Sequence, residues 1–137
     1  MDRTTLIACV ALAGLLTLPL PAGGQGRIDV PVEVGGDGFL DGCWGIGQVV
    51  GLDPNGDGFL SVRSGPGGRQ YREIDRVHNG QQVAICGEDG PWYAVVYSRT
   101  RDTSGCGVHT PWPVRQPYTG PCEYGWVHSR YVHVVAG

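Results

Sequence analysis

The segment Asp53-Pro54-Asn55-Gly56-Asp57-Gly58 is the chain's sharpest chemical motif. It matches the first, third, fifth and sixth positions of a calcium-binding loop, in which carboxylate and amide oxygens surround the cation. The twelfth position, however, is Ser64 instead of a glutamate, and Phe59–Arg63 alternates as a strand does, which opposes the curl of such a loop. We therefore expect a polar turn with Gly56 and Gly58 at positive φ, and a weak calcium site is the alternative.

Side chains for nucleophilic catalysis are present but not arranged in a known motif. The four histidines are His78, His109, His128 and His133. The chain has no Gly-x-Ser-x-Gly elbow, and oxidised cysteines would offer no Cys–His pair. Glu88 and Asp89 are adjacent in a turn, where their carboxylates would point apart instead of flanking a bond. We expect no catalysis and no cofactor.

Cysteine usage indicates an oxidising compartment. Four of the five cysteines lie beyond residue 25, and an even number in an exported chain is typical of two disulfides. Four cysteines allow three pairings. Cys106 and Cys122 flank one loop-like stretch, so we expect them to pair, which leaves Cys43 with Cys86. A zinc site is the weaker alternative, because the chain has no Cys-x-x-Cys spacing.

Residues 1–24 have the composition of a secretory signal peptide. A weakly cationic start precedes an apolar run from Leu6 to Leu20, and small residues then suit cleavage before Gln25 or, alternatively, after Ala22. The run is short of the roughly 20 residues that span a bilayer. We expect an exported protein, periplasmic or secreted, without stable membrane insertion after cleavage.

Composition excludes several classes of protein. Glycine and proline number 24 and 10 among 137 residues, and only 17% of residues are charged. A coiled coil would contain far more alanine, glutamate, lysine and leucine, and a disordered chain would have less than the 41% of hydrophobic residues found here. All ten basic residues are arginines, but the net charge of -3 gives no basic footprint for nucleic acid.

Apolar residues beyond residue 50 alternate as in short β-strands. Trp92–Tyr97 is instead apolar throughout, as expected of a strand that is covered on both faces. Asn79-Gly80 predicts a two-residue β-hairpin, and Asp89-Gly90 predicts a second turn. Five or six short strands with glycine turns indicate an all-β fold, a small β-barrel.

The mature chain divides into an N-terminal extension, residues 25–48, and a barrel, residues 49–135. An insertion at residues 98–123 is rich in glycine, proline and threonine. A structureless loop of that length is uncommon in a compact domain. We expect the Cys106–Cys122 bridge to tie it into a lobe.

Four segments carry a family pattern. Gly58–Gly67 reads GFLSVRSGPG, Asn79–Val83 reads NGQQV, Gly90–Val95 reads GPWYAV and Gly125–Val132 reads GWVHSRYV. In this order they resemble bacterial SH3-like (SH3b) domains, whose patterns are roughly L-N-V-R-S-G-P-G, G-x-x-V, G-x-W-x-x-V and G-W-V-x-x-x-Y-L. The long insertion resembles that of small secreted α-proteobacterial SH3 domain-containing proteins, sometimes labelled "integron" proteins.

The resemblance implies a barrel of about five strands and a targeting or binding role without catalysis, commonly toward peptidoglycan or peptides. SH3-type domains bind extended ligands in aromatic-lined grooves. The expected groove residues are Tyr71, Trp92, Tyr93, Trp126 and Tyr131, with Arg63 as a carboxylate partner. Each aromatic side chain has a place in the core as its alternative, and Arg63 has a pairing with Glu73 or Asp75.

Trp112 lies between two prolines of the tied loop, and we expect it to be an exposed contact. The overall prediction is an exported binding module of the cell envelope, with peptidoglycan or an envelope protein or peptide as its partner. The alternative is a structural protein that displays the tied lobe to a protein partner.

Overall fold

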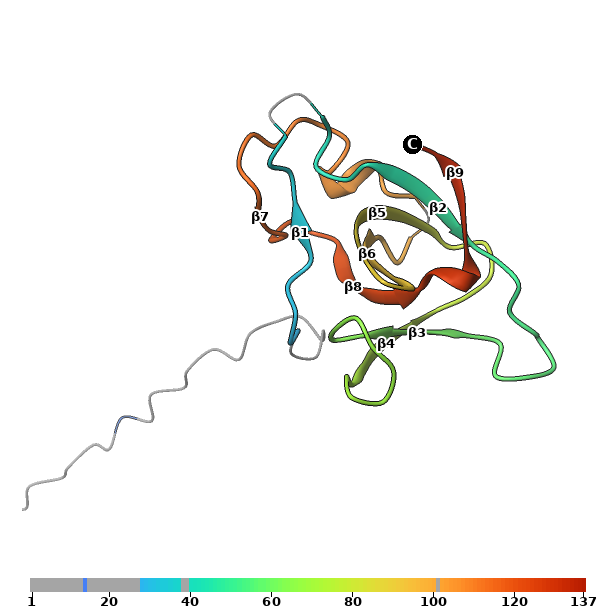
Figure 1. The fold of residues 1–137 in the computed structure, drawn as a ribbon. Helices are drawn as coiled ribbons and strands as arrows, with labels where there is room; N and C mark the ends of the chain where they lie inside the picture. The colour runs from blue at the N-terminus through green and yellow to red at the C-terminus, as the bar shows by residue number, and fades with distance from the viewer. Residues whose placement is uncertain (1–13, 15–27, 38–39, 101) are drawn as a thin grey trace, which may run out of the picture.

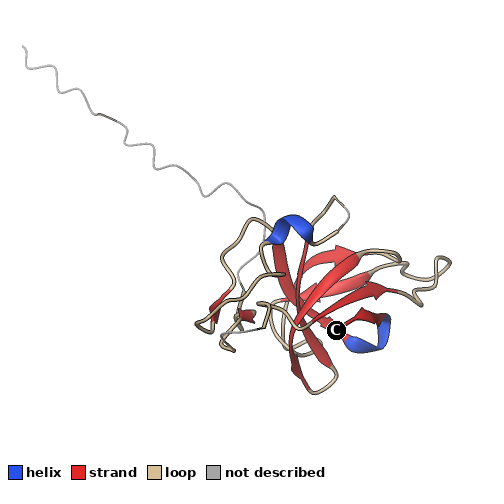
Figure 2. Cartoon of the chain, turned by 90° about the horizontal axis from the view of Figure 1, so that it is seen from above, coloured by secondary structure: helices blue, strands red, loops and turns tan. Residues whose placement is uncertain are grey.

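A computed structural model describes Gly14 and residues 28–37, 40–100 and 102–137 (Figure 1). The predicted signal peptide, residues 1–24, lies outside the described residues except for Gly14. The described chain is strand and loop apart from two short 3-10 turns, η1 (Ser104–Cys106) and η2 (Ser129–Tyr131) (Figure 2). This confirms the all-β prediction. No helix in these parts of the chain is long and apolar enough to cross a membrane.

The main sheet has seven antiparallel strands in the order β4-β3-β8-β6-β5-β2-β9. Their bounds are β2 Gly45–Val49, β3 Leu60–Arg63, β4 Glu73–Val77, β5 Gln82–Asp89, β6 Trp92–Tyr97, β8 Glu123–His128 and β9 Val132–Ala136. The sheet is strongly curved (Figure 1). Within the described residues the edge strands β4 and β9 do not pair with each other, so the sheet is open.

The sheet has more strands than the five or so expected, because β2 comes from the predicted N-terminal extension. β2 pairs with β5 on one side and with β9 on the other. The predicted boundary between residues 48 and 49 therefore falls inside a strand of the main sheet.

Neighbouring residues of β5, β6 and β8 point to opposite faces of the sheet, as the pleat requires. One face carries an apolar cluster that includes Val62, Val83, Ile85, Val95, Tyr97 and Val127. The other face carries a second cluster that includes Ala84, Ala94, Val96 and Trp126. The last four residues of β6 are all buried, which confirms that this strand is covered on both sides.

The described residues of the predicted extension and of the predicted insertion fold together into one lobe, residues 28–37, 40–43 and 103–122. Its two halves pair as β1 (Glu33–Val34) and β7 (Gln116–Pro117), which lie side by side in Figure 1. Further backbone hydrogen bonds join the halves, from Gly42 N to Thr110 O at 2.9 Å and from Tyr118 N to Val32 O at 2.8 Å. The lobe contributes Val32, Val34, Val108 and Tyr118 to the second cluster. It therefore covers the face of the sheet that carries this cluster.

Both predicted disulfides are present. Cys106 and Cys122 are joined at 2.07 Å and close the insertion, and Cys43 and Cys86 are joined at 2.01 Å. The first bridge therefore closes a loop within the lobe, whereas the second attaches the lobe to β5 of the main sheet.

The predicted hairpin at Asn79-Gly80 is wrong. The turn connects β4 to β5, but β4 pairs with β3 and β5 pairs with β2 and β6. The Asn79 side chain instead accepts from Leu52 N at 3.1 Å and donates to Leu52 O at 2.9 Å, which fixes a loop from elsewhere in the chain. The turn at Asp89-Gly90 does connect two paired strands, β5 and β6.

Candidate functional site

A cleft lies where β2, β9, the start of β5 and the loop after β6 meet. Its volume is about 650 Å³, which is within the range of small-ligand sites. We call it the polar cleft; it is lined by Gly47, Gln48, Gly80, Gln81, Gln82, Thr100, Asp102 and Val135. Its side chains offer amides, a hydroxyl and a carboxylate, all of which form directed hydrogen bonds.

Sheet register brings these residues together from distant parts of the chain. Gln48 is the exposed residue of β2 and lies opposite Gln82 of β5 on one side and His133 of β9 on the other. Gln81 follows the turn at Gly80, whose φ of 90° favours glycine. Because β6 is the other neighbour of β5, the loop that leaves β6 at Ser98 returns beside Gln81 and Gln82.

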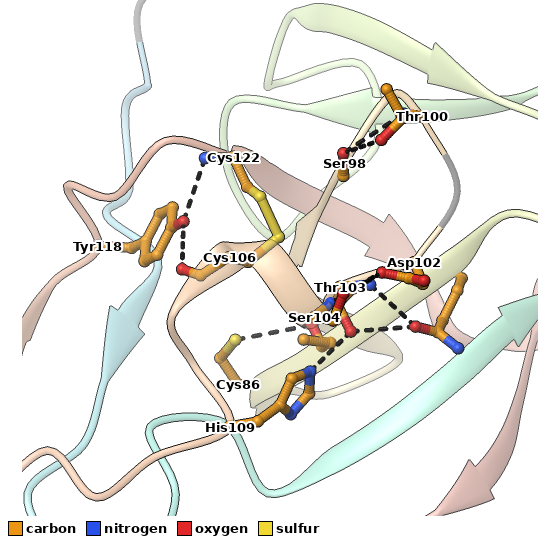
Figure 3. The surroundings of a disulfide bond; sticks show 12 residues. Cys86, Ser98, Thr100, Asp102, Thr103, Ser104, Cys106, His109, Tyr118 and Cys122 are labelled. Carbon is orange, nitrogen blue, oxygen red and sulfur yellow. Dashed lines mark hydrogen bonds between the residues drawn. A yellow bond between two sulfur atoms is a disulfide. The ribbon is translucent and has the colours of Figure 1, made fainter.

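A buried threonine joins the lobe to the wall of the cleft. Thr103 is fully buried, and its backbone N–H and hydroxyl donate to Gln82 Oε1 at 2.9 and 3.1 Å. Its Oγ1 also lies 2.7 Å from His109 Nε2 (Figure 3). With the hydroxyl hydrogen directed at Gln82, His109 Nε2 is the donor to Thr103. The contact with Thr103 therefore fixes the side chain of Gln82 in the wall of the cleft.

The cleft carries a negative charge at Asp102. The Ser104 hydroxyl and the Ser104 N–H both donate to Asp102 Oδ1, and these hydrogen bonds lower the pKa of the carboxyl below its usual range. The side chain is solvent-exposed and ionised at neutral pH. An anionic ligand is thus disfavoured at this end of the cleft.

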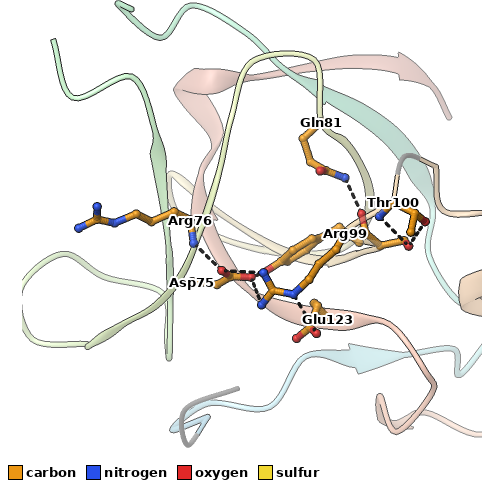
Figure 4. Close-up of polar contacts among 8 residues, drawn as sticks. Asp75, Arg76, Gln81, Arg99, Thr100 and Glu123 are labelled. Carbon is orange, nitrogen blue, oxygen red and sulfur yellow. Dashed lines mark hydrogen bonds and ion pairs between the residues drawn. The ribbon is translucent and has the colours of Figure 1, made fainter. Parts of the chain in front are cut away.

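A polar network fixes the base of the loop that borders the cleft (Figure 4). The hydroxyl of buried Tyr97 donates to Asp75 Oδ2 at 2.6 Å, and Arg99 bridges Asp75 at 3.0 Å and Glu123 at 3.3 Å. Burial and, secondarily, the hydrogen bond to Asp75 raise the pKa of Tyr97 well above its usual range. The loop therefore starts from a fixed point on β6.

The predicted aromatic residues do not form one groove. Trp92 and Tyr131 each contact His128 edge-on, with ring centroids 5.2 and 6.4 Å apart. Tyr93 instead contacts Trp44, with ring centroids 6.2 Å apart. The half-exposed rings thus form two groups.

Trp126 is part of the core. Its side chain is buried in the second cluster, and its indole N–H donates to Val30 O at 2.9 Å. The predicted role in a groove gives way to the structural alternative.

Tyr71 and Arg63 stabilise a glycine-rich loop. The Tyr71 ring lies directly on Gly65, where an added Cβ would come within 2.4 Å of the ring. Arg63 Nη1 donates to Tyr71 O at 3.0 Å, instead of forming the pairing with an acid that was its alternative. Both side chains therefore have a local role in holding the loop.

Trp112, which was expected to be an exposed contact, lies between the two halves of the lobe. Its indole N–H donates to Gly107 O at 2.8 Å, and its ring lies against Gly42, where a Cβ would be 2.9 Å away. The side chain is only partly exposed and packs against the second cluster. It holds the two halves of the lobe together.

The Asp53–Gly58 segment is a polar turn. Asp53 Oδ1 accepts from Asn55 N at 2.8 Å, and Asp53 O accepts from Gly56 N at 3.0 Å. Gly58 has the expected positive φ of 68°, but Gly56 does not. In the part of the chain that the structure describes, no group of three or more His, Cys, Asp or Glu side chains is placed to hold a metal ion.

No protein-family model, curated protein or solved structure matches this chain. The sequence did not identify the polar cleft as a site, although Gly80, Gln81 and Gln82 belong to the NGQQV segment. The adjacent pair Gln81 and Gln82 after a turn was the available signal, and polar residues beside a turn are too common to be specific.

Proposed function

We propose that this chain is an exported, non-catalytic binding module of the cell envelope, which binds peptidoglycan in the polar cleft. The observation that carries the proposal is the lining of that cleft, where Gln48, Gln81, Gln82, Thr100 and Asp102 offer donors and acceptors. A hydroxyl–imidazole contact lies nearby, but Thr103 is fully buried and cannot reach a substrate. Two disulfides support an oxidising compartment.

We also propose that the curved main sheet is an SH3-like barrel. The four resembling segments support this: they coincide with β3 and its following loop, the turn into β5, the start of β6, and β8 with the turn into β9. These strands enclose the first apolar cluster.

Trp92 and Tyr131 remain candidate ligand contacts in this proposal. With His128 they form a half-exposed row, and the guanidinium of Arg130 lies 5.8 Å from the Tyr131 ring centroid. Such rings offer stacking faces for a sugar or a peptide. These rings lie at the end of β6 far from the polar cleft, so they would contact an extended ligand that continues beyond it. For such a ligand, Trp92→Ala is expected to weaken binding several-fold without the unfolding that loss of Trp126 would cause.

Co-sedimentation with purified peptidoglycan sacculi tests the proposal. We expect the oxidised wild-type protein to pellet, and the double variant Gln48→Ala/Asp102→Asn to pellet at least fivefold less. Gln116→Ala, on the exposed edge of the lobe, is the matched control and should behave as wild type. Absence of pelleting by correctly folded wild-type protein would refute the proposal.

A second candidate function is display of the lobe to a protein partner. Leu40 and Val114 favour it, because both belong to the lobe and are 58% and 66% exposed. Exposed aliphatic side chains of this size are typical of contact sites when they gather in one region. Leu40→Ser/Val114→Ser should then abolish a cross-link to an envelope protein while leaving pelleting with sacculi unchanged.

A further inference from the structure

We infer that the polar cleft recognises an N-acetylated sugar, and that Gln81 and Gln82 bind its acetamido group. This inference rests on the proposed binding function and names the ligand class of the same cleft. It depends on the direction in which each glutamine presents its amide, which the backbone around them determines.

The amide of Gln81 presents its oxygen. Gln81 Nε2 donates to the backbone oxygens of Gln82 and Ser98, both at 2.9 Å. Carbonyl oxygens only accept, so the NH₂ group must face them. Both N–H hydrogens are thereby used, and Gln81 Oε1 is left as an acceptor at the cleft.

The amide of Gln82 presents its nitrogen. Gln82 Oε1 accepts from the backbone N–H of Thr103, which can only donate, and this sets the opposite orientation. Among the residues that the structure describes, Gln82 Nε2 has no acceptor. Two donor hydrogens are therefore available in the cleft that Gln81 also lines.

A fixed acceptor and a fixed donor in one cleft complement the N–H and C=O of an amide group. Because both glutamines are already held by the backbone, binding costs little further side-chain entropy. The remaining polar groups, Gln48, Thr100 and Asp102, suit hydroxyl groups, which both donate and accept. The combination of one amide and several hydroxyls is that of an N-acetylated sugar.

The charge of the cleft favours a sugar over a peptide. The ionised Asp102 carboxylate opposes the free carboxylate of a peptide. The volume of about 650 Å³ accommodates a small ligand.

Isothermal titration with three probes tests the ligand class. The probes are the N-acetylglucosamine trimer chitotriose, the glucose trimer cellotriose, which has the same linkage without acetamido groups, and trialanine. We expect chitotriose to bind at least tenfold more tightly than the other two. Equal binding of chitotriose and cellotriose, tighter binding of trialanine, or no binding of chitotriose would each overturn the inference.

Gln82→Glu tests the assigned donor. A glutamate keeps the oxygen that accepts from Thr103 but replaces the free NH₂ group by an acceptor, so the fold should be retained. We expect chitotriose affinity to fall at least tenfold, whereas Gln116→Glu, which makes the same charge change on the lobe, should not alter it. An unchanged affinity in Gln82→Glu would refute the assignment.

Failure of the inference is distinguishable from failure of the proposed function. If sacculi pellet the protein but chitotriose shows no preference over cellotriose, the module binds peptidoglycan by other groups and the inference is wrong. If chitotriose binds and sacculi do not pellet the protein, the sugar specificity stands and peptidoglycan is not the ligand.

Discussion

The side-chain oxygen of Gln82 accepts hydrogen bonds from both the backbone N–H and the hydroxyl of Thr103, at 2.9 and 3.1 Å. Gln82 begins β5 and lines the polar cleft, while Thr103 opens the tied half of the lobe. The lobe is therefore connected to the cleft by a buried contact. Substitutions in the lobe should change the affinity of the cleft for its ligand.

Thr103→Val removes the hydroxyl from this contact and keeps the side chain's shape. His109 Nε2 and one lone pair of Gln82 Oε1 then lose their partner, and we expect the free energy of unfolding to fall by about 1–2 kcal/mol. Urea denaturation measures the loss. Thr100→Val, an exposed position, should change stability by less than about 0.5 kcal/mol; equal effects of the two variants would argue against the buried contact.

Loss of the Cys106–Cys122 disulfide should lower both the stability of the protein and its affinity for a ligand in the polar cleft. The bridge spans 16 residues, and loop-closure entropy gives it about 3 kcal/mol. Cys106→Ala/Cys122→Ala should lose that stability and bind chitotriose more weakly, because Thr103 lies just before the bridge. Full affinity in a folded double variant would show that the cleft does not depend on the tied loop.

Loss of the Cys43–Cys86 disulfide should cost more stability. This bridge spans 43 residues, for which the same estimate gives about 4 kcal/mol. Thermal unfolding of Cys43→Ala/Cys86→Ala, compared with the other double variant under oxidising conditions, checks the order. A reversed order would indicate residual structure in the unfolded chain.

Tyr97 should make the protein sensitive to alkali. Its pKa is raised in the folded state, chiefly by burial, so above about pH 10 the unfolded chain loses a proton that the folded chain keeps. Stability is then fully present below pH 10 and falls by about 1.4 kcal/mol per pH unit above it. Tyr118, whose pKa burial also raises, adds to the fall.

Tyr97→Phe should remove the Tyr97 part of this alkaline loss. The variant costs about 1 kcal/mol at neutral pH through the lost hydrogen bond to Asp75, but its stability should decline less steeply between pH 10 and 11.5. Urea unfolding across that pH range provides the measurement. An unaltered slope would mean that Tyr97 ionises freely in the folded protein.

Trp126→Phe tests whether Trp126 is a core residue or a ligand contact. It deletes the hydrogen bond to Val30 O and leaves a small cavity, so we expect a loss of about 1–3 kcal/mol. Chitotriose affinity should stay within twofold of wild type. Trp44→Phe, at a 44% exposed position, is the matched control for stability and should have little effect.

Residue alternation and cysteine spacing were enough to predict the local elements. The strands around Leu60–Arg63 and Trp92–Tyr97, the turn at Asp89-Gly90 and both disulfides were found from the sequence, because each depends on neighbours within a short stretch or on a simple pairing argument. The predicted hairpin at Asn79-Gly80 failed because the same turn chemistry also serves strands that do not pair.

Only the tertiary structure determined the site and the roles of the aromatic residues. Gln48, Gln81 and Asp102 come from three separate segments, and their meeting depends on which strands are neighbours in the sheet. Likewise, an aromatic residue in a strand has the same local pattern whether it is buried, as Trp126 is, or half-exposed, as Trp92 is. The alternation of apolar and polar residues along a strand predicts which side chains share a face of the sheet. Which segment covers that face depends on contacts between residues far apart in the chain.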